Sequence, residues 1–235
     1  MNYWQRSSEE RKQAWDYLKQ NISPDIALVQ EAVPPPDFFD NENVCWREIG
    51  GNRKWGSGII TKSFPVRDVE KVQLDKRYHG ALIVGEASLP NRSTLTLISL
   101  YGLLDTKTYV TDTLHRMLSD LTPLLTEKLG KRTFVMGGDY NADRQYDKYY
   151  PYEPSHKIFF DRLEDFGLED CLAKFQKRPV QTHRHKSDPK FPWQNDYLHA
   201  SKKLTTKLIS CKVLDNEVVR RLSDHNPVIA EFDFL

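Results

Sequence analysis

The sequence predicts an α+β fold in which two packed sheets lie between outer helices. Segments with the apolar runs or the alternation typical of strands recur along most of the 235 residues. Only a few segments show the spacing of amphipathic helices. Strands that follow one another with little helix between them favour antiparallel pairing, and their apolar faces need a second sheet or helices to cover them. No linker of Gly, Ser or charge repeats divides the chain, so we expect one domain over residues 1–235.

Three segments predict helices. In residues 7–21, Ser7 and Glu10 have the spacing of a capping box, in which each side chain bonds the backbone amide of the other. Residues 111–128 show the clearest helical pattern, because their leucines fall on one face. Residues 155–166 predict the third helix, which completes the expected outer layers.

Apolar runs and alternating segments predict the strands, and turn residues separate them. Residues 55–58 are interpreted as a turn containing two glycines, and residues 89–92 as the turn of a hairpin. Gly137 and Gly138 are expected to end a short buried strand. The strands are predicted at residues 26–29, 45–48, 69–74, 80–87, 94–100, 134–136, 208–213 and 228–234. One more follows the turn within residues 55–61, and residues 192–198 lead into another.

The charge balance limits the kinds of partner. Thirty-four basic and 33 acidic residues leave a formal charge of +1, so a contact with nucleic acid requires a local basic patch. Residues 174–190 are locally basic. They are either a solvated loop or a loop that contacts phosphate beside a cleft, with Trp193 available for stacking.

The cysteines and the apolar runs exclude several classes of protein. The three cysteines are far apart and contain no Cys-x-x-Cys pair, which argues against a zinc site and a disulfide framework and fits a reducing compartment. No apolar run approaches the length of a membrane span, and no signal peptide is recognisable. We therefore expect a cytoplasmic protein with no membrane contact and no obligate protein partner.

Acidic and amide side chains follow several predicted strands. They are Glu31, Asp139 with Asn141, Asp196, and Asp224 beside His225. Oxygen ligands without cysteine favour Mg²⁺ or Mn²⁺. A histidine beside a carboxylate can act as an acid or as an electrostatic catalyst. Together these groups predict metal-assisted hydrolysis of a phosphate ester.

Five short motifs occur in the order found in the endonuclease/exonuclease/phosphatase superfamily, and the chain resembles that superfamily over nearly its whole length. This family of metal-dependent phosphoesterases includes pancreatic deoxyribonuclease and the abasic-site endonucleases. The resemblance implies a four-layered α/β/β/α sandwich of two mostly antiparallel sheets with flanking helices, and a divalent metal at one end of the sheets. The motifs are Asp25-Ile-Ala-Leu-Val-Gln-Glu31, Trp55-Gly-Ser-Gly-Ile-Ile60, Gly138-Asp-Tyr-Asn141, Asn195-Asp-Tyr-Leu198 and Ser223-Asp-His-Asn-Pro227.

The resemblance also implies catalytic roles. Asp139 resembles the group that orients or deprotonates the attacking water, and Asn141 its neighbour that holds the phosphate. His225 resembles the histidine beside the scissile phosphate, and Asp196 the carboxylate that orients it. Tyr101 occupies the place of a tyrosine or histidine that contacts phosphate in some members.

On the metal side, Glu31 resembles the main metal ligand and Asp224 the second carboxylate. The family's sequences normally open with a buried strand that ends in a Trp-Asn motif. Here only the tail of that motif is present, with Asn2 at its second polar position. We therefore expect a fold that lacks this first strand, or a chain that begins at an internal methionine.

Three functions remain open at this point. The first is a Mg²⁺-dependent nuclease that cleaves DNA or RNA. The second is a phosphatase or phosphodiesterase that acts on a small or lipid-derived phosphate, which a near-neutral charge permits. The third is a catalytically impaired binding protein, which the incomplete first motif suggests.

Overall fold

The computed structural model describes residues 6–38, 42–69, 74–91, 93–104, 108–127, 133–149, 155–186 and 193–234. The α-helices in these ranges are α1 (Ser8–Tyr17), α2 (Val110–Thr126), α3 (Ser155–Asp165), α4 (Lys202–Thr205) and α5 (Glu217–Leu222). Helix α1 continues into a π-helical turn, Leu18–Ile22, and short 3-10 turns cover Pro36–Phe38, Lys76–Tyr78 and Arg144–Lys148.

The strands form one large sheet and two smaller ones. The six-stranded sheet has the order β4-β5-β6-β7-β9-β8, the three-stranded sheet the order β1-β3-β2, and β10 pairs with β11. The bounds are β1 Ile26–Ala32, β2 Val44–Gly50, β3 Arg53–Thr61, β4 Val66–Asp68, β5 Leu82–Ser88, β6 Thr94–Leu100, β7 Thr133–Asp139, β8 Leu168–Asp170, β9 Asp196–Ser201, β10 Leu208–Val213 and β11 Val228–Phe232.

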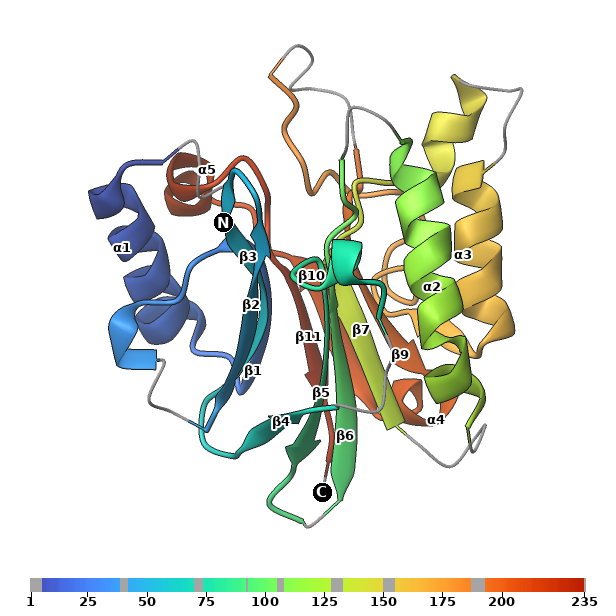
Figure 1. Cartoon of the computed structure of the whole chain (residues 1–235), viewed down its shortest axis with the longest axis horizontal. Helices are drawn as coiled ribbons and strands as arrows, with labels where there is room; N and C mark the ends of the chain where they lie inside the picture. The colour runs from blue at the N-terminus through green and yellow to red at the C-terminus, as the bar shows by residue number, and fades with distance from the viewer. Residues whose placement is uncertain are drawn as a thin grey trace.

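Helices cover the outer faces of these sheets, which confirms the predicted α/β/β/α arrangement. Figure 1 shows α1 outside the three-stranded sheet, and α2 with α3 outside the six-stranded sheet. Alternate residues of the large sheet face opposite ways: Ile98 packs with the helices α2 and α3, whereas Leu97 packs between the sheets. Residues of β10 and β11 join that same inner core, so this two-stranded ladder adds to the layer of the three-stranded sheet.

The first predicted helix begins as expected. Ser7 caps α1, its side chain accepts from the amide of Glu10, and the Glu10 carboxylate accepts from the amide of Ser7. Trp15 is buried beneath the helix and donates its indole N–H to the Val33 carbonyl at 3.1 Å. The cap and this aromatic contact hold α1 against the end of β1.

Two sequence predictions of secondary structure were wrong in detail, and a third falls mostly outside the described ranges. Residues 55–58 are not a turn but the buried centre of β3, where a Cβ on Gly56 would lie 1.7 Å from the carbonyl oxygen of Arg47 in β2. Glycine is needed there for close backbone approach. The strand predicted at 69–74 falls mostly on residues 70–73, which lie outside the described ranges, and the short strand β4 precedes it at Val66–Asp68. Strand β7 continues through Gly137 and Gly138 to Asp139.

The pairing of β7 determines where the functional side chains emerge. Strand β6 is parallel to β7, so the C-terminal ends of these two strands lie at the same edge of the sheet. Strand β9 is antiparallel to β7, and the register places Asp196 directly opposite Asp139. The other ladders are antiparallel, as predicted, including the β5–β6 hairpin.

No helix within the described ranges combines the length and the apolar composition needed to cross a bilayer.

A buried histidine in β9 should make stability depend on pH. His199 is 2% exposed, and burial lowers its pKa from 6.5 to about 4. Because the unfolded chain binds this proton more tightly, the stabilisation is complete above the unfolded pKa and is lost as the pH falls from 6.5 toward 4. Denaturant titration should therefore show that the free energy of unfolding of the native chain falls between about pH 7.5 and about pH 4.5. For His199→Phe this fall should be smaller by about 2 to 3 kcal/mol. His79→Phe, at an exposed position, is the matched control. If the free energy of unfolding fell equally with pH in the native chain and in His199→Phe, the expected role of burial would be contradicted.

Candidate active site

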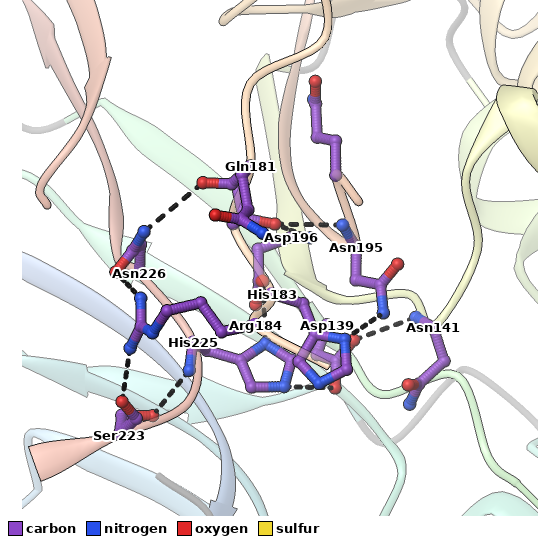
Figure 2. A network of polar contacts seen from close by, with 12 residues as sticks. Asp139, Asn141, Gln181, His183, Arg184, Asn195, Asp196, Ser223, His225 and Asn226 are labelled. Atoms are coloured by element: carbon purple, nitrogen blue, oxygen red, sulfur yellow. Dashed lines mark hydrogen bonds and ion pairs between the residues drawn. The ribbon is translucent and has the colours of Figure 1, made fainter. Parts of the chain in front are cut away.

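Three predicted site residues meet at the end of β7. His225, in the loop before β11, donates its Nδ1–H to the Asp196 carboxylate at 2.8 Å. Its Nε2 lies 3.8 Å from Oδ2 of Asp139. Figure 2 shows this imidazole reaching both carboxylates. The sheet register brings the two carboxylates together, and the loop supplies the histidine between them.

Burial and charge change the protonation of this group. Burial raises the pKa of Asp139, and the nearby His225 opposes that shift. Burial lowers the pKa of His225, but the carboxylates of Asp196 and Asp139 outweigh it, so the net pKa is raised. The imidazole is therefore protonated at neutral pH and lies between two carboxylates.

Glu31 lies at an irregular point of β1, where the register with β3 shifts between Val29 and Ala32. Its backbone has φ of 47°, which is in the left-handed region that non-glycine residues rarely adopt. The Tyr101 hydroxyl donates to the Glu31 carboxylate at 2.8 Å. Burial, followed by the charge of Glu31, raises the pKa of Tyr101, so the phenol stays protonated. Tyr101 therefore orients Glu31 directly.

Asn141 has the same unusual backbone conformation, with φ of 50°. Its amide N–H donates to Oδ1 of Asp139 at 2.9 Å, and its side-chain Nδ2 donates to the Gly102 carbonyl at 3.0 Å. These contacts fix one oxygen of Asp139 and leave Oδ2 on the side of His225. Strained backbone at two predicted site residues is typical of a functional site.

The charge of Asp224 favours the protonated form of both His225 and His183, although burial and the charge of His225 lower the pKa of His183 overall. Its carbonyl oxygen accepts from the Arg184 amide at 2.9 Å. Asn2, the remaining predicted ligand, lies outside the described residues.

A segment that the sequence analysis treated only as a basic loop connects the parts of the site. The buried Thr182 hydroxyl accepts from the amides of Asn195 and Asp196, each at 2.9 Å. The Thr182 carbonyl accepts from the amide of Asn226 at 2.7 Å. Thr182 thus ties the start of β9 to the loop that carries His225. No periodicity or motif in the sequence indicated this role.

Other charged and aromatic groups surround the site. Arg53 lies over the Trp55 ring at 5.7 Å, and Trp55 meets Tyr101 edge-on at 5.3 Å. Trp193 packs on Tyr146 with ring centroids 4.2 Å apart. The basic segment is partly used within the fold, because Lys174 pairs with Glu169 at 2.8 Å and Arg184 bonds Asn226 and the Ser223 carbonyl.

The carboxylate of Glu31 suits a hard divalent cation. Glu31 is half-buried and forms no ion pair with any residue in the described ranges. Its charge also raises the pKa of Asp139, so the two carboxylates influence each other. A carboxylate without an ion pair, such as Glu31, fits a cation that prefers oxygen ligands.

Comparison with models of protein families finds no match, and comparison with curated protein sequences finds none either. Solved structures do match. A 3′ phosphatase from Neisseria, bound to its product DNA hairpin, superposes with a TM-score of 0.68 at 19% identity, over 97% of this chain and 95% of the other. An AP endonuclease from Archaeoglobus fulgidus gives 0.67 at 17% identity, over 97% and 96%. An endonuclease/exonuclease/phosphatase family protein from Leptotrichia buccalis gives 0.62 at 14% identity, over 99% and 97%.

This chain has the endonuclease/exonuclease/phosphatase fold. The resemblance based on five short motifs is thereby confirmed at the level of fold. In this endonuclease/exonuclease/phosphatase fold, Asp139, Asp196 and His225 lie together at one end of the sheets, with Glu31 and Tyr101 as a neighbouring pair.

The charge balance around His225 can be tested without any substrate. Replacing Asp196 by Asn removes the carboxylate at 2.8 Å and should lower the pKa of His225 by about one unit or more. NMR titration of the imidazole, without divalent metal, measures this shift. Asp37→Asn, at an exposed ion pair with Lys19, should leave the pKa of His225 unchanged. An unchanged pKa in Asp196→Asn would show that this carboxylate does not maintain the imidazolium.

Proposed function

We propose that this protein is a Mg²⁺-dependent phosphodiesterase acting on nucleic acid, a nuclease of the endonuclease type. The observation that carries the proposal is the protonated His225 held between Asp196 and the buried Asp139. This arrangement supplies a base for water and a cation for a phosphoryl oxygen within one small region.

Asp139 is the proposed base. It is 6% exposed, and burial raises its pKa toward neutral pH, which suits a group that must accept a proton from water. The amide of Asn141 occupies Oδ1 and leaves Oδ2 for the water. The side chain of Asn141 is proposed to hold the phosphate beside it.

His225 is the proposed electrostatic partner of the phosphate. Its imidazolium can donate from Nε2 to a phosphoryl oxygen, where negative charge develops during attack by water. Asp196 holds the ring through Nδ1 and keeps the proton on Nε2 available. Two neighbouring groups whose environments suit opposite proton-transfer roles are typical of hydrolytic sites.

Glu31 and Asp224 are the proposed ligands of Mg²⁺, for which Mn²⁺ could substitute, and Asn2 is a third candidate. The ion would neutralise phosphate charge and polarise the bond to be broken. Tyr101 donates to Glu31 at 2.8 Å, so its proposed role is to orient this ligand as well as to line the phosphate site.

Two observations support nucleic acid as the substrate. The matched Neisseria 3′ phosphatase is bound to a DNA hairpin, and the matched Archaeoglobus fulgidus protein is an AP endonuclease. In this chain, Arg53 and Trp193 provide a cation and an aromatic ring beside the site, which are the groups that contact backbone phosphates and bases.

A small or lipid-derived phosphate ester is the second candidate substrate. The net charge of +1 supports it, as do the internal contacts of Lys174 and Arg184, which leave less of the basic segment for a nucleic acid backbone. The third candidate, a catalytically impaired binding protein, predicts binding without hydrolysis.

Hydrolysis of labelled DNA and RNA, duplex and single-stranded, tests the proposed chemistry. Activity should require Mg²⁺ and disappear with chelator. His225→Ala and Asp139→Asn should each lower kcat by about 10²- to 10⁴-fold, because each removes a proton-transfer or charge-stabilising group. Glu31→Gln should mainly raise the Mg²⁺ concentration required. His79→Ala, at an exposed histidine, is the control and should match the native chain. Unchanged hydrolysis in both Glu31→Gln and Asp139→Asn would show that the site is elsewhere.

Salt dependence separates the two substrate classes. Binding of fluorescent duplex DNA to Asp139→Asn should weaken by about 100-fold between about 50 and about 200 mM salt if three or four phosphates are contacted. Fluorescence anisotropy measures this affinity. A nearly flat salt dependence would instead favour a small phosphate ester.

A further inference from the structure

His183 faces His225 across a short antiparallel contact between two loops. The two residues form a bridge, flanked by the hydrogen bonds from the Asn226 amide to the Thr182 carbonyl and from the Arg184 amide to the Asp224 carbonyl. Residues paired in this way project their side chains to the same side. The two imidazoles accordingly stack, with centroids 4.5 Å apart and planes 25° apart (Figure 2).

The contacts of Asn195 determine which nitrogen of His183 carries the proton. The Tyr146 hydroxyl donates to Oδ1 of Asn195 at 3.0 Å, which identifies the other amide atom as the Nδ2 donor. That Nδ2 lies 3.3 Å from Nδ1 of His183, so Nδ1 must accept. Burial and the charge of His225 lower the pKa of His183 to about 4, so the ring is neutral. A neutral ring that accepts at Nδ1 carries its proton on Nε2.

The Nε2–H of His183 has no hydrogen-bond partner among the residues that the structure describes. It is not sealed in the interior either, because His183 is only half-buried and Nε2 is not among the buried side-chain atoms without partners. The ring is thus held from one side by Asn195 and presents an oriented, uncharged donor beside His225. A ring that served only to support His225 would not need its nitrogens fixed in this way.

We propose that His183 is a substrate-binding residue whose Nε2–H donates to a non-bridging oxygen of the phosphate that His225 contacts. This inference rests on the proposed function, since the phosphate is that of the ester to be hydrolysed. The two stacked imidazoles then bind the same phosphate, one as a cation and one as a neutral donor. Tyr146 and Asn195 act as positioning residues, because they reach the phosphate only through His183.

Two substitutions separate donation from stacking. His183→Phe keeps a flat ring over His225 but has no N–H, and should lower kcat/KM for Mg²⁺-dependent hydrolysis by about 10- to 100-fold. His183→Gln carries an amide N–H at a similar distance from the backbone and should recover part of that loss. His79→Phe controls for the chemical change, and circular dichroism melts confirm that each variant is folded. Activity of His183→Phe equal to the native chain, or equal losses in the Phe and Gln variants, would overturn the proposal.

A second measurement does not depend on hydrolysis. Long-range proton–nitrogen NMR spectra report the tautomer of each imidazole, and His183 should be neutral and protonated at Nε2. Addition of inorganic phosphate with Mg²⁺ should shift the Nε2 resonance of His183. If the native chain hydrolyses nothing, the proposed function fails, but this phosphate-dependent shift would still support the binding role. An Nδ1-protonated ring, or a resonance that phosphate does not move, would overturn it.

Discussion

The antiparallel register of β7 against β9 is the constraint on which the site depends. It places Asp139 and Asp196 opposite each other at the end of the large sheet, where the first is almost fully buried. Two carboxylates so placed repel each other unless a cation lies between them. His225 supplies that cation from a loop far along the chain, and its own protonation is maintained by the same two carboxylates. The pairing of β7 with β9 therefore sets both the positions of the two carboxylates and the protonation of His225.

The backbone around this pair is shaped to bring the remaining groups close. Gly138 has φ of 143°, and a Cβ there would lie 2.1 Å from the Leu100 carbonyl oxygen, so glycine is required where β6 and β7 end together. Glu31 and Asn141 adopt left-handed backbone conformations that cost free energy. The register shift in β1 and the contacts of Asn141 with Asp139 and Gly102 maintain these conformations. The strain is thus located at the residues that carry the proposed chemistry.

Hydrogen bonds from loops give the site its rigidity. Thr182 joins the start of β9 to the loop before β11, and Tyr146 orients Asn195, which in turn orients His183. These side chains come from three separate segments, and none of them lies in a regular helix or in β7. A side chain that neighbouring groups already hold in place loses less conformational freedom when a substrate binds, so these contacts would pre-organise the site for the proposed phosphate. The fold shared with solved phosphatases and endonucleases provides the sheets, and these loop contacts connect the side chains at their edge.

The sequence by itself determined the fold class, most of the strands and the capped start of α1, and it predicted that Asp139 and Asp196 lie near strand ends. These follow from local periodicity and from motifs that lie within a few residues of one another. The turn predicted at residues 55–58 was wrong because the glycines of β3 allow the neighbouring strand to approach closely. No local sequence pattern reveals such an approach. Only the tertiary structure decided the stacking of His183 on His225, the tautomer of His183 and the tie made by Thr182. Each of these depends on contacts between segments distant in sequence, and hydrogen-bond direction exists only once those segments are packed together.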